Sequence, residues 1–134
     1  MSDYNSGFTG DRVVELLNMI PNLAKADLSN AMTVSLGQNG YAKFNNGLLI
    51  QWGYKTASSS GTNTVYTPIA FYNGAYVPIV TYREPGNGMN IVTGLITIIQ
   101  TSYFTVRTRY TVGDSNGTGA GTNPFYWIAV GRWK

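Results

Sequence analysis

Residues 103–111 read Tyr-Phe-Thr-Val-Arg-Thr-Arg-Tyr-Thr, and this stretch decides the fold class. From residue 104 onward the chain alternates between two sets of side chains. The first set is Phe104, Val106, Thr108 and Tyr110, and the second is Thr105, Arg107, Arg109 and Thr111. A period of two places the sets on opposite faces of a β-strand. The alternation predicts a strand with one face in a core and the other in solvent, as in antiparallel sheets.

Asn-Gly pairs divide the chain around this strand into short segments. The pair tolerates positive φ at both central positions of a type I′ turn, which makes it a strong hairpin signal. The pairs lie at residues 39–40, 46–47, 73–74, 87–88 and 116–117. The apolar, β-branched runs between them predict strands at 41–44, 48–54, 65–71, 75–82, 91–99, 103–111 and 125–133. We therefore expect a mostly β protein, an antiparallel β-sandwich of about six or seven strands.

Three of these predicted strands, 48–54, 91–99 and 125–133, are apolar on both faces. In the last of them Phe125 and Trp127 alternate with Tyr126 and Ile128, so that neither face is polar. A sandwich has one interior, which buries one face of each strand. The other apolar face of these strands must be shielded from water in another way. Either one such strand is central and lies under a helix, or the outer face meets another subunit. The pattern favours the subunit, because small domains often gain burial by oligomerising.

The first forty residues follow a different pattern. Thr9 can cap a helix over residues 11–20, and Pro21 ends it. Val13, Leu16 and Ile20 have a spacing that fits either a helix packed on its own domain or a short coiled-coil neck. Leu23 and Leu28 extend the helical pattern by a further turn or two before Gly40. We divide the chain into a lead-in and short helical neck (1–40) and a β-sandwich (41–134).

The amino-acid composition excludes several common catalytic mechanisms. The chain has 134 residues, no Cys and no His, so thiolate catalysis and the usual general base are absent. Only two of its six carboxylates, Glu84 and Asp114, lie in the predicted β body, whereas a glycosidase site needs a close pair. We therefore expect that the protein is not an enzyme.

The net charge of +3 comes from basic residues spread along the chain, which predicts no nucleic-acid partner. No apolar run reaches membrane-spanning length, and the N-terminus lacks the pattern of a signal peptide. We therefore expect that the protein is made in a cytoplasm and does not insert into a membrane.

Two loop motifs resemble cofactor sites without completing them. The glycine-rich segment 117–121 lacks the lysine of a phosphate-binding loop and precedes a strand. The segment beginning at Asp114 resembles part of a calcium loop but lacks the distal glutamate. We expect no cofactor and no metal site.

Tyr, Asn, Arg and carboxylate side chains gather at predicted turns, where a rigid scaffold usually carries its binding site. Such a set suits sugar recognition, because aromatic rings stack on C–H faces and amides bind hydroxyls. For any single residue, surface filling or turn formation is the simpler explanation. The candidate ligand-binding residues lie in the 83–90 turn, the 113–124 loop and their surroundings: Tyr82, Arg83, Glu84, Asn87, Asn90, Tyr110, Asp114, Asn116 and Tyr126.

Three strings resemble the C-terminal receptor-binding domain of bacteriophage tail fibres. They are NGLLIQWG at 46–53, YTPIAF at 66–71 and FYWIAVGRW at 125–133, in the order and spacing of that family. The resemblance covers residues 41–134, and the first forty residues fit the shaft that would precede such a tip. It implies a homotrimeric, H-type lectin-like sandwich that recognises a host surface. Trp52, Phe71, Trp127 and Trp133 then serve core and subunit packing, and no binding residue carries over, because receptor loops vary.

The expected function is that of a phage or prophage tail-fibre tip, located on the virion, which binds a bacterial surface glycan without cutting it. Its expected partners are two copies of itself, the upstream shaft and the host receptor. Three alternatives remain at this stage. They are a purely structural module that caps or trimerises the fibre, a polysaccharide depolymerase, and an adhesin for a protein receptor.

Overall fold

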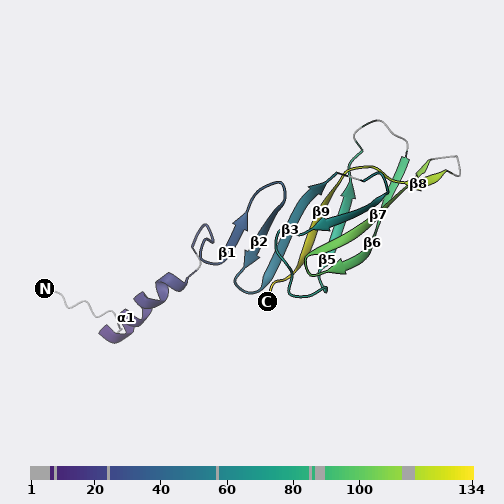
Figure 1. The fold of residues 1–134 in the computed structure, drawn as a ribbon. Helices are drawn as coiled ribbons and strands as arrows, with labels where there is room; N and C mark the ends of the chain where they lie inside the picture. The colour runs from purple at the N-terminus through teal and green to yellow at the C-terminus, as the bar shows by residue number, and fades with distance from the viewer. Residues whose placement is uncertain are drawn as a thin grey trace. The chain divides into compact units, whose positions relative to one another are not determined.

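The computed structural model describes residues 7, 9–23, 25–56, 58–84, 86, 90–112 and 117–134. The chain divides into two compact units, Met1–Met32 and Thr33–Lys134. The second unit is the β-sandwich of Figure 1, and each unit is described by itself.

The first unit contains helix α1 (Gly10–Met19) and the 3-10 turn η1 (Ile20–Asn22), as the sequence predicts for this region. The side chain of Thr9 caps the helix by accepting a hydrogen bond of 3.3 Å from the Arg12 backbone N–H. Arg12 and Glu15 form an ion pair of 2.6 Å one turn apart. No residue of α1 is buried, and the apolar side chains of Val13, Leu16 and Ile20 are exposed.

Residues 25–28, where the sequence suggests a further turn of helix, are not helical, and a strand begins soon after them. Leu28 has a φ of 57°, a left-handed conformation that no α-helix continues through. Beyond it, Thr33 and Val34 are β-branched residues that favour the extended conformation. The resulting strand is β1 (Met32–Ser35), at the edge of the first sheet.

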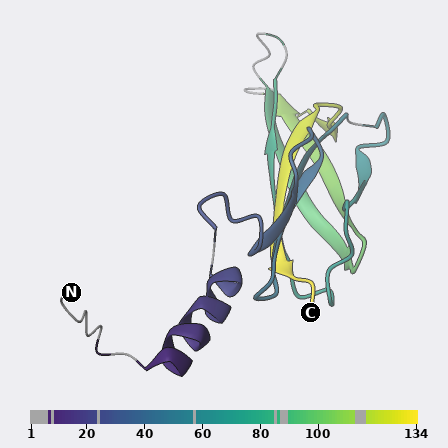
Figure 2. The same ribbon diagram turned by 90° about the vertical axis from the view of Figure 1, so that its left-hand side faces the viewer.

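The sandwich has two sheets, which are the two layers visible in Figure 2. The first has the order β1-β2-β3-β9-β5, with β2 at Gly40–Phe44, β3 at Leu48–Lys55, β9 at Phe125–Arg132 and β5 at Val77–Tyr82. The second has the order β4-β7-β6, with β4 at Thr62–Tyr66, β7 at Tyr103–Val112 and β6 at Asn90–Gln100. A short strand, β8 (Thr118–Ala120), pairs with the end of β7. The expected antiparallel β-sandwich is confirmed.

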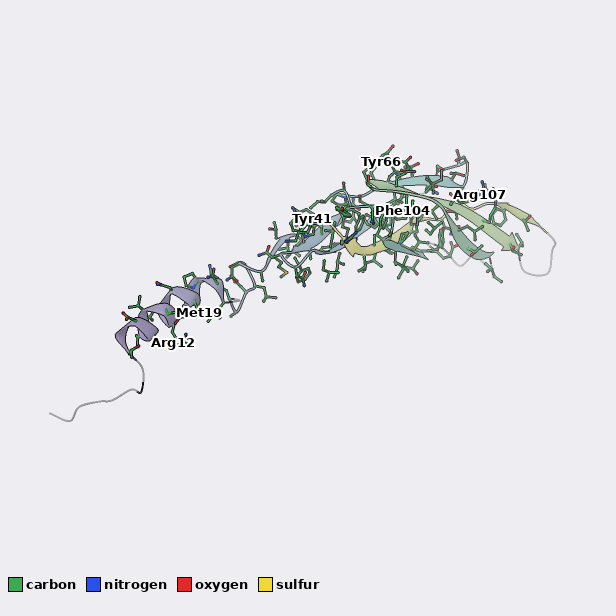
Figure 3. All side chains as sticks on the ribbon, turned by 90° about the horizontal axis from the view of Figure 1, so that it is seen from below. Arg12, Met19, Tyr41, Tyr66, Phe104 and Arg107 are labelled. Carbon is green, nitrogen blue, oxygen red and sulfur yellow. The ribbon has the colours of Figure 1, made fainter. Side chains whose placement is uncertain are left out.

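The core lies between the two sheets and follows the predicted alternation of β7. Phe104, Val106 and Thr108 are buried, and Figure 3 labels Phe104 between the layers. Thr105, predicted to face solvent, is also buried. A bulge in β6 shifts the register next to Thr97, and the Thr97 and Thr105 hydroxyls hydrogen-bond at 2.6 Å. The hydroxyl partner allows a threonine to be buried on the nominally polar face.

The strand predicted at 65–71 is shorter and lies earlier, as β4 at Thr62–Tyr66. Pro68 has no N–H to donate to a ladder, and the chain leaves the sheet there. The following residue pairs with a side chain, because Gln51 exchanges two hydrogen bonds of 2.8 Å with the Ile69 backbone. Strand β8 was not predicted, because Thr-Gly-Ala carries no apolar period.

Candidate functional site

Tyr82, a predicted binding residue, lies at the end of β5 with its side chain turned toward the second sheet. Its hydroxyl is 3.1 Å from Thr108 Oγ1, and its ring is 5.5 Å from that of Phe125. The ring lies over Gly94, where an added Cβ would be 2.8 Å from Tyr82 Cζ. Burial raises the pKa of the Tyr82 phenol, and the Thr108 hydrogen bond partly opposes this. The contacts of Tyr82 are therefore those of a residue that joins the two sheets.

Arg83 and Glu84 lie in the connection that follows β5, beside the residues that precede β9. The Arg83 N–H donates to the Pro124 carbonyl at 2.8 Å. The Asn123 amide donates to Glu84 Oε2 at 2.7 Å, and the Gly86 N–H donates to Glu84 Oε1 at 3.1 Å. Both carboxylate oxygens of Glu84 are thus engaged, and the two connections are joined at an exposed end of the sandwich.

Tyr110 and Tyr126 lie on different sheets. Tyr110 is half-buried in β7, with its ring against Gly119 of β8, while Tyr126 faces outward from β9 and contacts the Tyr54 ring at 5.2 Å. Asn90 begins β6 opposite Val112. The remaining candidates, Asn87, Asp114 and Asn116, lie outside the described residues. Tyr82 and Tyr126 lie on neighbouring strands, through the partners Thr81–Tyr126 and Tyr82–Phe125, but their side chains point to opposite faces of the first sheet.

A groove that the sequence did not predict lies elsewhere on the sandwich, where β3 and β9 meet the end of β4. Its volume is about 560 Å³. It is lined by Asn39, Tyr54, Lys55, Val65, Tyr66, Thr67, Pro68 and Trp127. The sequence signal that points to it is Gly53, because a glycine inside a strand often marks a close approach by another group.

Trp127 is buried in the wall of this groove, 4% exposed, and its ring packs edge-on against Phe104 at 5.8 Å. The indole N–H groups of the other two tryptophans donate to carbonyls: Trp52 to Gly37 at 3.2 Å and Trp133 to Phe44 at 2.7 Å. Trp127 Nε1 makes no hydrogen bond within the described part of the chain. It is not sealed from solvent either, because no unpartnered side-chain N or O atom is buried among those residues.

The outer face of the first sheet is apolar across three strands. Residues paired in register there form rows, of which Ile79–Ile128–Trp52 is the central one. Ile79 is 57% exposed and Ile128 is 40% exposed. The flanking rows are Thr81–Tyr126–Tyr54 and Val77–Val130–Ile50. The predicted second apolar face therefore exists on β3 and β9, and neither sheet of the described sandwich covers it.

The outer face of the second sheet is different, because Arg107 and Arg109 of β7 lie there, beside Leu95 and Thr93 of β6. Figure 3 shows Tyr66 and Arg107 on this layer. Within the described residues, no three His, Cys, Asp or Glu side chains come close enough to hold a metal ion. No helix of the described chain has both the length and the hydropathy needed to cross a membrane.

The family whose description reads "Putative tail fiber protein gp53-like, C-terminal" matches residues 43–132. The match covers the sandwich from β2 to β9. This chain therefore belongs to that family, and the sandwich is a C-terminal tail-fibre domain. No curated protein matches the chain.

Solved structures of pyocin tail fibres have a similar fold. An N-truncated R2-type pyocin tail fibre aligns with a TM-score of 0.58 and 21% identity, over 75% of this chain and 37% of that one. A second R2 fibre structure, from P. aeruginosa, gives the same TM-score and identity over 26% of its own length. An N-truncated R1-type fibre aligns with a TM-score of 0.54 and 18% identity, over 95% of this chain and 99% of that one. The aligned part of the chain thus spans 37% and 26% of the two R2 fibre chains.

Proposed function

We propose that the domain forms the distal end of a phage or prophage tail fibre and binds carbohydrate on the host surface without cleaving it. The family match carries the first half of the proposal, because residues 43–132 include nearly the whole sandwich. The fold supports the second half, since a rigid sandwich presents its connections as a binding surface. The Glu84–Asn123 hydrogen bond joins two of those connections, and the proposed receptor contacts lie around them.

The domain works in this proposal as a homotrimer joined to the upstream shaft. The supporting observation is the apolar outer face of the first sheet. Three strands about 4.8 Å apart and five residues at about 3.3 Å each cover a plan area of roughly 240 Å². Soluble monomers rarely expose contiguous apolar patches larger than a few hundred Å². An interface between copies would cover this face.

The small number of carboxylates in the sandwich agrees with binding without cleavage. Residues 33–134 contain only Glu84 and Asp114 as acidic side chains. Both oxygens of Glu84 accept hydrogen bonds, from the Gly86 N–H and the Asn123 amide, so this carboxylate is already held by groups of the domain itself. A general acid of a glycosidase needs a raised pKa and a second carboxylate nearby. The depolymerase alternative therefore has little support.

The structural alternative is a module that only caps and trimerises the fibre, and the same apolar face favours it. Light scattering and cell labelling on the purified chain separate the two functions. A mass of about 44 kDa, three times 14.6 kDa, together with labelling of bacteria would support the proposal. A trimer that labels none of a broad panel of bacteria would favour the structural module. A monomer would contradict the trimeric fibre tip.

A further inference from the structure

We propose that the groove beside Trp127 binds one sugar ring that carries a carboxylate or phosphate group. The inference rests on the proposed carbohydrate recognition and names a site for it outside the loops at the end of β5. The groove volume of about 560 Å³ lies within the range of small-molecule sites. Its lining combines aromatic rings with an amide, a hydroxyl and an ammonium group.

Trp127 supplies a fixed hydrogen-bond donor to this groove. Its ring is held by the edge-on contact with Phe104 at 5.8 Å, and only 4% of its surface is exposed. Its Nε1–H nevertheless has no acceptor among the described residues. Buried tryptophans usually find a partner for this group, as Trp52 and Trp133 do here. A ligand hydroxyl in the groove would provide the missing acceptor.

Gly53 allows this donor and the Asn39 side chain to approach the backbone of β3 closely. A Cβ at position 53 would lie 2.6 Å from Trp127 Nε1 and in closer contact still with Asn39 Oδ1. The Asn39 oxygen already accepts a hydrogen bond of 2.9 Å from the Tyr54 N–H, which holds the amide at this position. The indole N–H and the Asn39 amide therefore both lie close against the backbone of β3 at Gly53, where no side chain would fit. A donor and an acceptor held near the same point suit the adjacent hydroxyls of a sugar.

Tyr66 provides an apolar surface at the rim of the groove. It is 72% exposed, although its ring is braced by Tyr103 at 5.8 Å, and Figure 3 labels it on the outside of the second sheet. A large exposed aromatic ring that contacts a second ring offers an apolar surface on which a sugar ring can stack.

The charge of the domain favours an anionic ligand. Lys55 lines the groove. Among the described residues the ion pair formed is Arg12–Glu15, so Lys55 has no ion-pair partner there. Residues 33–134 contain seven Lys or Arg and two Asp or Glu, a net charge of +5, although the whole chain carries only +3. A positive domain with an unpaired ammonium in the groove attracts carboxylate or phosphate substituents.

The test uses the three indole N–H signals of the full chain in an NMR titration. The probes are glucuronate, glucose 6-phosphate and glucose, each raised to 50 mM at about 0.15 M salt, so that attraction between exposed charges is already screened. We expect the Trp127 signal, assigned with Trp127→Phe, to shift with at least one acidic probe. We expect the signals of Trp52 and Trp133 to shift far less, and glucose to bind at least about fivefold more weakly than the acidic probe.

Variants then test each contact. Lys55→Gln should weaken binding of the acidic probe about five- to tenfold, whereas Lys25→Gln, with the same change in net charge, should leave it unchanged. Tyr66→Ala should abolish saturable binding, and Tyr72→Ala, another exposed tyrosine, should not.

A Trp127 signal that no probe shifts would overturn the groove proposal. If the domain still labels bacteria in that case, the proposed function stands and the receptor site lies elsewhere. If all three probes bind equally well, the preference for an acidic sugar is wrong.

Discussion

Gln51 and Ile69 form a reciprocal pair of hydrogen bonds. The Gln51 amide donates to the Ile69 carbonyl, and the Ile69 N–H donates to Gln51 Oε1, both at 2.8 Å. Gln51 is completely buried. Two of the strings that carry the family resemblance, 46–53 and 66–71, therefore contact each other through this pair. The pair fixes the connection from β4 to β5, and with it Pro68 at one wall of the groove.

Replacing Gln51 with Leu should destabilise the domain by about 1–3 kcal/mol. The change keeps the volume but leaves the part-buried Ile69 N–H without an acceptor, which costs roughly 1–3 kcal/mol, whereas the Ile69 carbonyl still accepts a hydrogen bond of 2.9 Å from the Thr67 hydroxyl. Urea unfolding measures the free energy, and Gln38→Leu, at an exposed position, serves as the control. A loss no larger than that of the control would contradict the structural role of the pair.

The apolar face should determine the oligomeric state. Ile79→Lys together with Ile128→Lys places two charges in the central row of the first sheet's outer face. We expect the mass by light scattering to fall from about 44 kDa to about 15 kDa with the sandwich still folded, because desolvating two unpaired ammonium groups is costly.

Thr62→Lys with Thr93→Lys, at exposed positions of the second sheet, provides the matched control for charge. If this control dissociates and the first variant does not, then the interface lies on the other sheet.

Stability should decrease at alkaline pH because of Tyr76. Burial raises the pKa of this phenol to about 12, and its hydroxyl lies 3.0 Å from the carbonyl oxygens of Gln100 and Tyr103. Between pH 10 and 12 the unfolded chain loses the Tyr76 proton while the folded chain keeps it. The free energy of unfolding therefore falls with rising pH, by no more than about 2 kcal/mol from this group. Below pH 10 both states are protonated, and Tyr76 contributes no pH dependence.

Tyr76→Phe isolates this contribution, because the other tyrosines and lysines titrate in both proteins. Urea unfolding of the variant at pH 9.5 and 11.5 should show a smaller alkaline loss than that of the unchanged chain. An equal loss of unfolding free energy in the two proteins would show that the Tyr76 phenol does not cause the alkaline destabilisation.

The connection between β5 and β6 should contribute to host binding. Glu84→Ala removes the acceptor for the Asn123 amide and the Gly86 N–H. Because these bonds are exposed, the free energy of unfolding should change by less than about 1 kcal/mol, while labelling of bacteria should fall at least about fivefold. Glu15→Ala, which breaks an exposed ion pair in the first unit, is the control. Unchanged labelling would place the receptor contacts away from this connection.

The sequence predicted features that depend on local patterns. The cap at Thr9 and the alternation of β7 follow from neighbouring residues alone. The limits of β4 could not be predicted from neighbouring residues. The Ile69 N–H donates to the side-chain amide of Gln51 on another strand and not to a neighbouring strand of its own sheet.

The candidate site shows the same division. Tyr82 was predicted at the end of a strand and as a ligand contact, and the structure confirms the strand position, but the strand period turns its side chain inward toward Thr108. The groove was missed because it forms where Gly53 and Trp127, 74 positions apart in the sequence, meet as paired residues of β3 and β9. No local period contains that contact.

Labelling of bacteria by the fluorescent domain, before and after mild periodate oxidation of the cells, tests the central claim most directly. Periodate cleaves the vicinal diols of sugars and leaves most surface protein intact. The account predicts that the domain labels at least one strain of a broad panel and that oxidation abolishes the labelling. Labelling that survives oxidation but is lost after protease treatment would contradict carbohydrate recognition and identify a protein receptor.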